Sequence, residues 1–135
     1  MESMKLKCPV TIKAKVTADL KKNMLENIQT NLKNVELDLQ QMEIQAKRAI
    51  EEQAQRDLQG VEPLRQHIEM ERQKRLEFKQ QMLSQEQEAE HLEIGAEIVQ
   101  GTLEQIIEVK VGDDMKELMN TEILVEDGKI IAFRS

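Results

Sequence analysis

Aromatic residues are almost absent from this chain. It has 135 residues with no tryptophan and no tyrosine, and its two phenylalanines are Phe78 and Phe133. Large aromatic side chains usually dominate a globular core, so little material is present for one, and the eight methionines must pack together with leucine and isoleucine. One third of the residues are charged. This composition suits a long helix pair with a small second core.

Cysteine, glycine and long apolar runs are also scarce. The single cysteine, Cys8, excludes an internal disulfide. The five glycines are too scattered for a phosphate-binding loop. The first residues lack the apolar segment of a signal peptide, and no apolar run approaches the length needed to cross a bilayer. We therefore expect a cytoplasmic location, a reduced thiol and no membrane partner.

The most informative pattern is an apolar repeat in the first half of the chain. Apolar residues follow one another at spacings of three and four, which is typical of a coiled-coil seam. The seam positions are Leu25, Ile28, Leu32, Val35, Leu39, Met42, Ala46 and Ala49. Thr17 is a suitable N-cap, so the pattern predicts a helix from there to about Gln59.

A turn is expected where this helix ends. Gly60 is a good left-handed C-cap and Pro63 suits the first position of a new helix. We therefore predict a turn at residues 60–63 and a second helix over residues 63–92, which places facing residues symmetrically about Glu62. In this register Met42 meets Met82, Ala46 meets Phe78, and Leu25 and Ile28 have no partner on the second helix.

The two ends of the chain predict β-structure. Apolar and polar residues alternate strictly from Leu6 to Val16, as in a strand with one buried face, and Pro9 indicates an edge or a bulge. After Gly95, short β-branched runs predict further strands, and the Asp-Gly pair at 127–128 predicts a type I′ hairpin.

These elements predict an α+β fold. A long antiparallel two-helix coiled-coil hairpin projects from a small antiparallel β-module that both termini form. We divide the chain into an N-terminal strand at 1–17, the hairpin at 18–94 and the C-terminal strands at 95–135. Residues 1–16 carry four lysines and one acid, whereas residues 96–135 carry nine acids and four bases. We interpret these as solvated faces, with specific electrostatic pairing as the alternative.

No group of residues predicts catalysis, a cofactor or a metal. His67 and His91 lack a second ligand at zinc spacing, so surface histidines are the favoured interpretation. Cys8 falls on an apolar strand face and is expected to be a buried thiol. Residues 112–114 with Glu117 do not match a calcium loop and are interpreted as a solvated turn. We predict no enzymatic activity, no cofactor and no metal.

The candidate interaction surface lies near the predicted tip of the hairpin. Polar residues occupy seam positions there, which favours a structural role in register over an interaction surface. A basic stretch on the second helix is interleaved with glutamates, as in intrahelical ion pairing, and no aromatic platform for bases is present. The candidate residues are Gln53, Arg56, Arg65, Glu71, Arg72, Lys74 and Arg75.

The two ends also carry sequence motifs of a known family. They are Val10-Thr11-Ile12-Lys13 with Val16-Thr17, then Glu108-Val109-Lys110-Val111-Gly112-Asp113, and Glu122-Ile123-Leu124-Val125-Glu126-Asp127-Gly128-Lys129-Ile130. With these motifs the chain resembles the YlqD family of small bacterial proteins. Genes of that family often lie beside genes for ribosome maturation, so the resemblance implies a role around ribosome assembly. It carries over no catalytic or binding residue.

Two functional hypotheses follow. The first is a non-enzymatic protein–protein interaction, scaffold or chaperone-like module that uses the coiled-coil rod. Its protein partner is not readable from the sequence, and the exposed flanks of the helices or an open strand edge could support a homo-oligomer. The alternative is a ribosome- or RNA-associated assembly factor that uses the basic stretch on the second helix.

Overall fold

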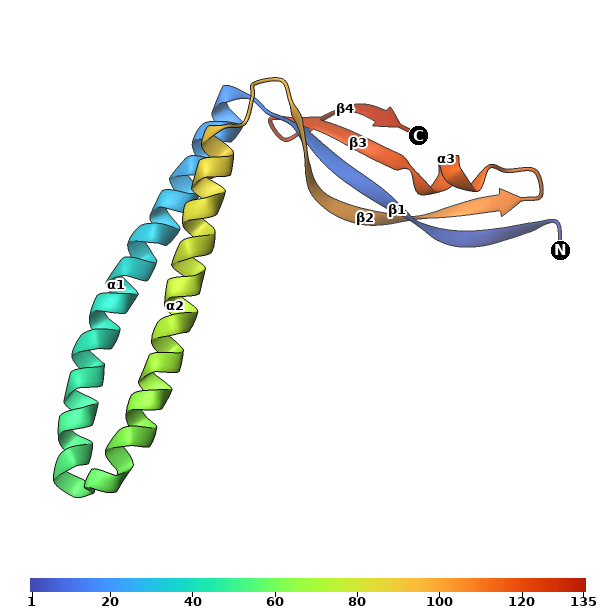
Figure 1. The fold of residues 1–135 in the computed structure, drawn as a ribbon. Coiled ribbons are helices and arrows are strands. Elements are labelled where there is room, and N and C mark those ends of the chain that lie inside the picture. Colours follow the sequence, from blue (N-terminus) through green and yellow to red (C-terminus); the bar gives the residue numbers. More distant parts are fainter. The chain divides into compact units, whose positions relative to one another are not determined.

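The computed structural model describes residues 1–135 and divides into two compact units. One unit, the sheet unit, joins Met1–Lys22 to Leu92–Ser135, and the other, the hairpin unit, is Asn23–His91. Figure 1 shows the elements. In chain order they are β1 (Ser3–Lys15), α1 (Ala18–Arg56), a 3₁₀ turn (Leu58–Gly60), α2 (Val61–Glu90), β2 (Glu97–Lys110), α3 (Met115–Met119), β3 (Thr121–Glu126) and β4 (Lys129–Arg134).

The ends of the long helices follow from local hydrogen bonds. The N–H of Leu20 donates to Oγ1 of Thr17 at 3.1 Å, which confirms the predicted N-cap. After α1 the Asp57 side chain accepts the N–H of Gln59 at 3.0 Å, so this aspartate caps the 3₁₀ turn. The turn therefore begins before Gly60, whose φ of −79° is not the left-handed conformation expected for it. Pro63 lies within the first turn of α2.

The core of the hairpin unit is small. Ile28 on α1 clusters with Met82 and Ala89 on α2, and Leu25 and Leu32 pack against them. The expectation that Ile28 has no partner on the second helix is therefore wrong.

The predicted pairing of Met42 with Met82 is also wrong. Met82 lies against Ile28 and Asn31, and the Asn31 amide is 3.9 Å from the Met82 sulfur. The register is displaced along α1 by about three helical turns. The physical reason is that the chain turns back at Asp57, several residues before the predicted centre.

In the sheet unit four strands pair in the order β2-β1-β3-β4. The β1–β2 and β3–β4 pairs are antiparallel, whereas β1 and β3 run parallel. The fold class is thus α+β, with a helical hairpin and a sheet that both termini build, as predicted. The sheet is mixed and not wholly antiparallel. The segment that contains α3 crosses from β2 to the other side of β1, where β3 begins parallel to β1.

The predicted alternation in the first strand is confirmed by burial. Cys8, Val10 and Ala14 of β1 are buried together with Val16, as is Leu124 of β3. β1 is a central strand, but its pairing with β3 starts only at Val10. Pro9 therefore has no strand on that side, where a missing N–H is tolerated.

Ion pairs connect strands of the sheet unit. Lys13 on β1 pairs with Glu122 on β3 at 2.9 Å, and Arg134 on β4 pairs with Glu97 on β2 at 2.6 Å. The first contact is a specific electrostatic pairing between the basic first segment and the acidic last segment, whereas the second lies within the last segment.

Candidate functional site

The structure separates the residues of the predicted polar tip. Gln53 lies at the turn, where its side-chain amide donates to the Asp57 carbonyl at 3.1 Å, and Arg56 is the last residue of α1. Glu71 and Arg75 lie farther along α2 and pair with other residues. The four residues therefore do not form one polar layer, because that layer depended on the incorrect helix register.

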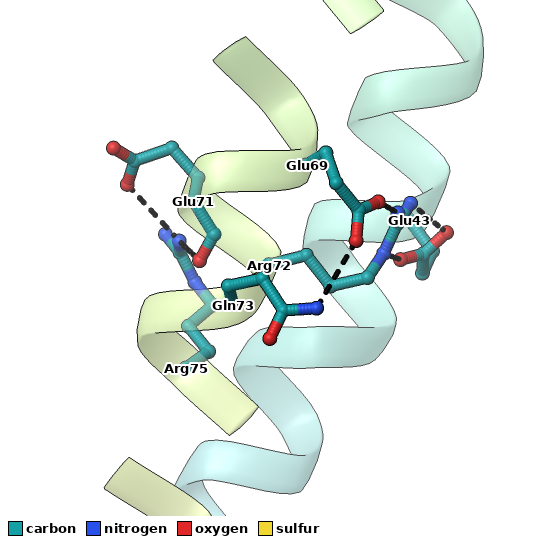
Figure 2. A network of polar contacts seen from close by, with 6 residues as sticks. All are labelled: Glu43, Glu69, Glu71, Arg72, Gln73 and Arg75. Atoms are coloured by element: carbon teal, nitrogen blue, oxygen red, sulfur yellow. Dashed lines mark hydrogen bonds and ion pairs between the residues drawn. The ribbon is translucent and has the colours of Figure 1, made fainter. Parts of the chain in front are cut away.

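Arg72 connects the two helices of the hairpin unit. Its Nε lies 2.6 Å from Oε1 of Glu43 and its Nη2 lies 3.1 Å from Oε2, so one guanidinium holds both carboxylate oxygens. Glu69, one turn away on α2, also accepts from this guanidinium. Figure 2 shows Arg72 reaching from α2 to Glu43 on α1. A two-pronged contact of this kind fixes orientation as well as distance.

Arg75 makes a second connection between the helices. Its Nε lies 2.7 Å from Oδ2 of Asp38 on α1, while its Nη1 donates to the Glu71 carbonyl at 2.9 Å and contacts the Glu71 carboxylate at 3.2 Å. Lys74 pairs with the same glutamate at 3.3 Å. Lys79 adds a third link between the helices, 3.3 Å from Glu36.

These contacts change the acidity of two carboxylates. The hydrogen bond from Arg72 lowers the pKa of Glu43 below its ordinary value. The hydrogen bonds from Lys74 and then Arg75 lower the pKa of Glu71. In both cases the cation stabilises the ionised carboxylate. The basic stretch of the second helix is therefore largely neutralised by its own neighbours. Among the charged candidate residues, the exposed Arg56 and Arg65 form no ion pair.

A second feature of the hairpin unit is a set of exposed apolar side chains. Phe78, predicted to be packed against Ala46, is 42% exposed and borders a groove with Val35 and Arg75. Other large apolar residues project from both helices: Leu37, Ile44, Met70, Leu76 and Leu83.

Sequence reasoning missed these residues because it followed only the seam. Leu37 and Ile44 are seven residues apart, and so are Leu76 and Leu83. Residues seven apart lie on one side of a helix. This repeated spacing outside the seam is the signal that could have identified them.

The described chain contains no group of three or more His, Cys, Asp or Glu side chains in a geometry that could hold a metal ion. Nδ1 of His91 lies 2.7 Å from the Gln87 carbonyl one turn before it. Cys8 is a buried free thiol, as predicted. No helix combines the length and apolar character that crossing a membrane requires.

Comparison with known proteins assigns the family. The family model described as YlqD protein matches residues 4–134. The chain belongs to the YlqD family. The match spans both terminal strands and the hairpin. The similarity to the family is therefore not limited to the motifs at the two ends of the chain.

One solved structure is similar over nearly the full length of this YlqD family member. It is the crystal structure of a protein of unknown function from Synechococcus sp. WH 8102, with a TM-score of 0.82 and 26% sequence identity. The alignment covers 98% of this chain and 95% of that one. No curated protein sequence matches the chain.

Proposed function

We propose that this YlqD family member is a non-enzymatic interaction protein whose helical hairpin docks a protein partner. The observation that carries the proposal is the set of large apolar side chains that the hairpin unit leaves in solvent. Ile44, Met70 and Phe78 are 60%, 61% and 42% exposed. Exposed apolar side chains that form a contiguous patch rimmed by polar residues commonly mark protein-binding surfaces. Met70 and Phe78 both border Lys74.

The surroundings of these side chains suit a protein interface. Phe78 lies beside Arg75 and Lys74 in the same groove, and Arg75 is held in place by Asp38 and Glu71. An apolar centre with an ordered, charged rim is the usual anatomy of such an interface. An amphipathic helix of the partner, laid along α2, would cover Met70 and Phe78, which are about two turns apart. The hairpin would then act as a scaffold or chaperone-like arm.

Side-chain substitution with affinity capture tests this proposal. The tagged full-length chain is compared with Met70→Ser and Phe78→Ser variants, and Gln80→Ser and Gln81→Ser on the same helix serve as matched controls. Captured proteins are identified by mass spectrometry, and the strongest one is titrated directly with each variant. We expect binding to be lost in the apolar variants and kept in the controls. Equal binding by all variants would refute the hairpin as the docking site.

The RNA-binding alternative has weaker support. Arg72, Arg75 and Lys79 each pair with an acidic residue of α1, so binding phosphate would require breaking these contacts. Fluorescence anisotropy with labelled RNA at low salt separates the two functions. If RNA binds and replacement of Arg72, Lys74 and Arg75 by alanine abolishes it, the alternative stands and the proposal does not.

A further inference from the structure

The outer side of β2 is a long open sheet edge. β2 has 14 residues, stands first in the strand order and pairs only with β1. Its other row of backbone N–H and C=O groups has no strand beside it within the sheet unit. Such an edge is a template for pairing with another strand.

The interior of this edge strand lacks lysine and proline. Natural edge strands often carry one or the other, but between Glu97 and Lys110 β2 has neither. Four lysines and the one proline of the sheet lie on the central strand β1. Val99, Leu103 and Ile106 of β2 are 65%, 56% and 69% exposed, so the edge is both open and apolar.

We propose that β2 pairs antiparallel with β2 of a second copy of this chain. A strand paired antiparallel with its own copy satisfies a two-fold axis, the commonest symmetry of protein oligomers. The four-stranded sheets of two copies then continue into one another. This interface is independent of the hairpin surface, and it stands whether or not the hairpin binds a partner.

The backbone limits where the two-fold axis can lie. β1 residues Ile12 and Lys13 pair with Gly101 and Val99, so Gln100 is an extra residue that forms a bulge. A bulge disrupts the ladder and increases the twist. The regular part of β2 is therefore residues 102–110, and the axis must fall near its middle.

The charge pattern then limits the register. Facing residues must lie on the same face of the sheet, so the axis passes through a residue. With the axis at 104, Glu104 faces its own copy, and with the axis at 106, Glu104 faces Glu108. Like charges directly opposite each other destabilise a sheet. With the axis at Gln105 no acid faces an acid, and Leu103 meets Ile107.

An axis at residue 103 also avoids facing acids. It pairs Ile106 with Gln100, however, and so places the bulge inside the interface. With the axis at Ile107, Glu104 faces Lys110 and again no acid faces an acid. Gln105 and Ile107 are therefore the two positions that satisfy both the charge pattern and the regular backbone. The geometry assigns this edge to self-association and limits its centre to these two residues.

Disulfide trapping tests the register in the full-length chain. Gln105 faces Cys8 within one chain, so the test uses a Cys8→Ala background to prevent an internal bond. Facing residues of an antiparallel pair have Cα atoms about 4.5–5.5 Å apart, within the range that a disulfide spans. Gln105→Cys and Ile107→Cys are tested one at a time, and the variant whose cysteine lies on the axis should form a linked dimer under mild oxidation. Lys129→Cys, on the opposite edge strand β4, is the control and should not.

Sedimentation analysis of the chain without cysteine substitutions tests the interface separately. We expect a monomer–dimer equilibrium. Ile106→Glu places a glutamate opposite an acid of the second copy, so it should raise the dimer dissociation constant by about tenfold or more. Ile131→Glu makes the same exchange on β4 and should have little effect. A chain that stays monomeric at all concentrations would overturn the proposal. A dimer that is weakened equally by both glutamate variants, or one trapped through residue 129 and through neither 105 nor 107, would overturn it as well.

Discussion

Single residues at the turn between β3 and β4 show how local conformation supports the sheet unit. Asp127 and Gly128 have φ of 48° and 83°, the left-handed pair that a type I′ hairpin requires. The Asp127 carboxylate also accepts a hydrogen bond of 2.6 Å from the Thr17 hydroxyl, the same oxygen that caps α1. One aspartate therefore shapes the hairpin and holds the residue that starts the first long helix.

A glycine exchange tests the turn. Gly128→Ala should destabilise the sheet unit by about 1–2 kcal/mol, because a side chain at positive φ is strained. Gly101→Ala is the matched control, since that glycine has no positive φ and open space where a Cβ would lie. Its effect on the free energy of unfolding should be small. Urea unfolding followed by far-ultraviolet circular dichroism measures the free energy of unfolding of both variants. Equal losses of stability would contradict the role given to Gly128.

The ion pairs of the hairpin predict a dependence on pH. Arg72 lowers the pKa of Glu43 in the folded chain, so the stabilisation is present above the unfolded pKa of about 4.3. It is lost as the pH falls through the lower, folded value. The thermal midpoint of the helical signal should therefore decrease as the pH is lowered from 5 to about 3.

The Glu43→Gln variant should lose part of this acid sensitivity. Glu51→Gln removes an exposed carboxylate of the same helix that forms no ion pair, and it should keep the acid response of the parent chain. If the two variants respond alike to acid, the contact between Glu43 and Arg72 does not contribute to the stability of the hairpin.

At the scale of elements, the type and order of the helices and strands could be predicted from the sequence. The register between the two long helices could not. The apolar repeat from Leu25 to Ala49 defines α1, and Thr17 defines its start. The facing side of α2 carries Met82 and Ala89 but also Arg72, Arg75 and Lys79, so its apolar repeat is too short to fix a register. Ion pairs with α1 align the helices instead, and such contacts cannot be read from one helix alone. Phe78 was consequently assigned to the seam, although it is an exposed candidate contact residue.

Cross-linking tests the observed register of the hairpin. In a Cys8→Ala background, cysteines at Asn31 and Met82 should react rapidly within one chain with a short bismaleimide, because these side chains are in contact. Cysteines at Met42 and Met82 are the control. Residue 42 lies about three turns, or about 16 Å, farther along α1, so intrachain cross-linking should be slow. Faster cross-linking of the second pair would show that the helices pair in the register symmetric about Glu62 and not in the observed one.

At the scale of the whole molecule, the sheet unit is discontinuous in sequence. The alternation in the first strand and the β-branched runs after Gly95 are enough to predict that both termini share a sheet. The strand order is not predictable from them, because a β-branched strand can pair on either side of β1. The short helix α3 decides it: Asp114 caps this helix by accepting the N–H of Lys116 at 2.9 Å, and the chain then enters β3 parallel to β1.

Removal of one strand at a time tests this topology. β1 lies between β2 and β3 and contributes the buried residues Cys8, Val10 and Ala14, so deletion of residues 1–16 should abolish the sheet. Deletion of residues 129–135 removes only the edge strand β4 and should leave the β1–β2 and β1–β3 pairs. Amide hydrogen exchange reports each strand separately. The first deletion should remove protection throughout β2 and β3 while α1 and α2 keep theirs, because their buried contacts lie within the hairpin unit. If β2 and β3 stay protected without β1, the parallel pairing is not what holds the two ends of the chain together.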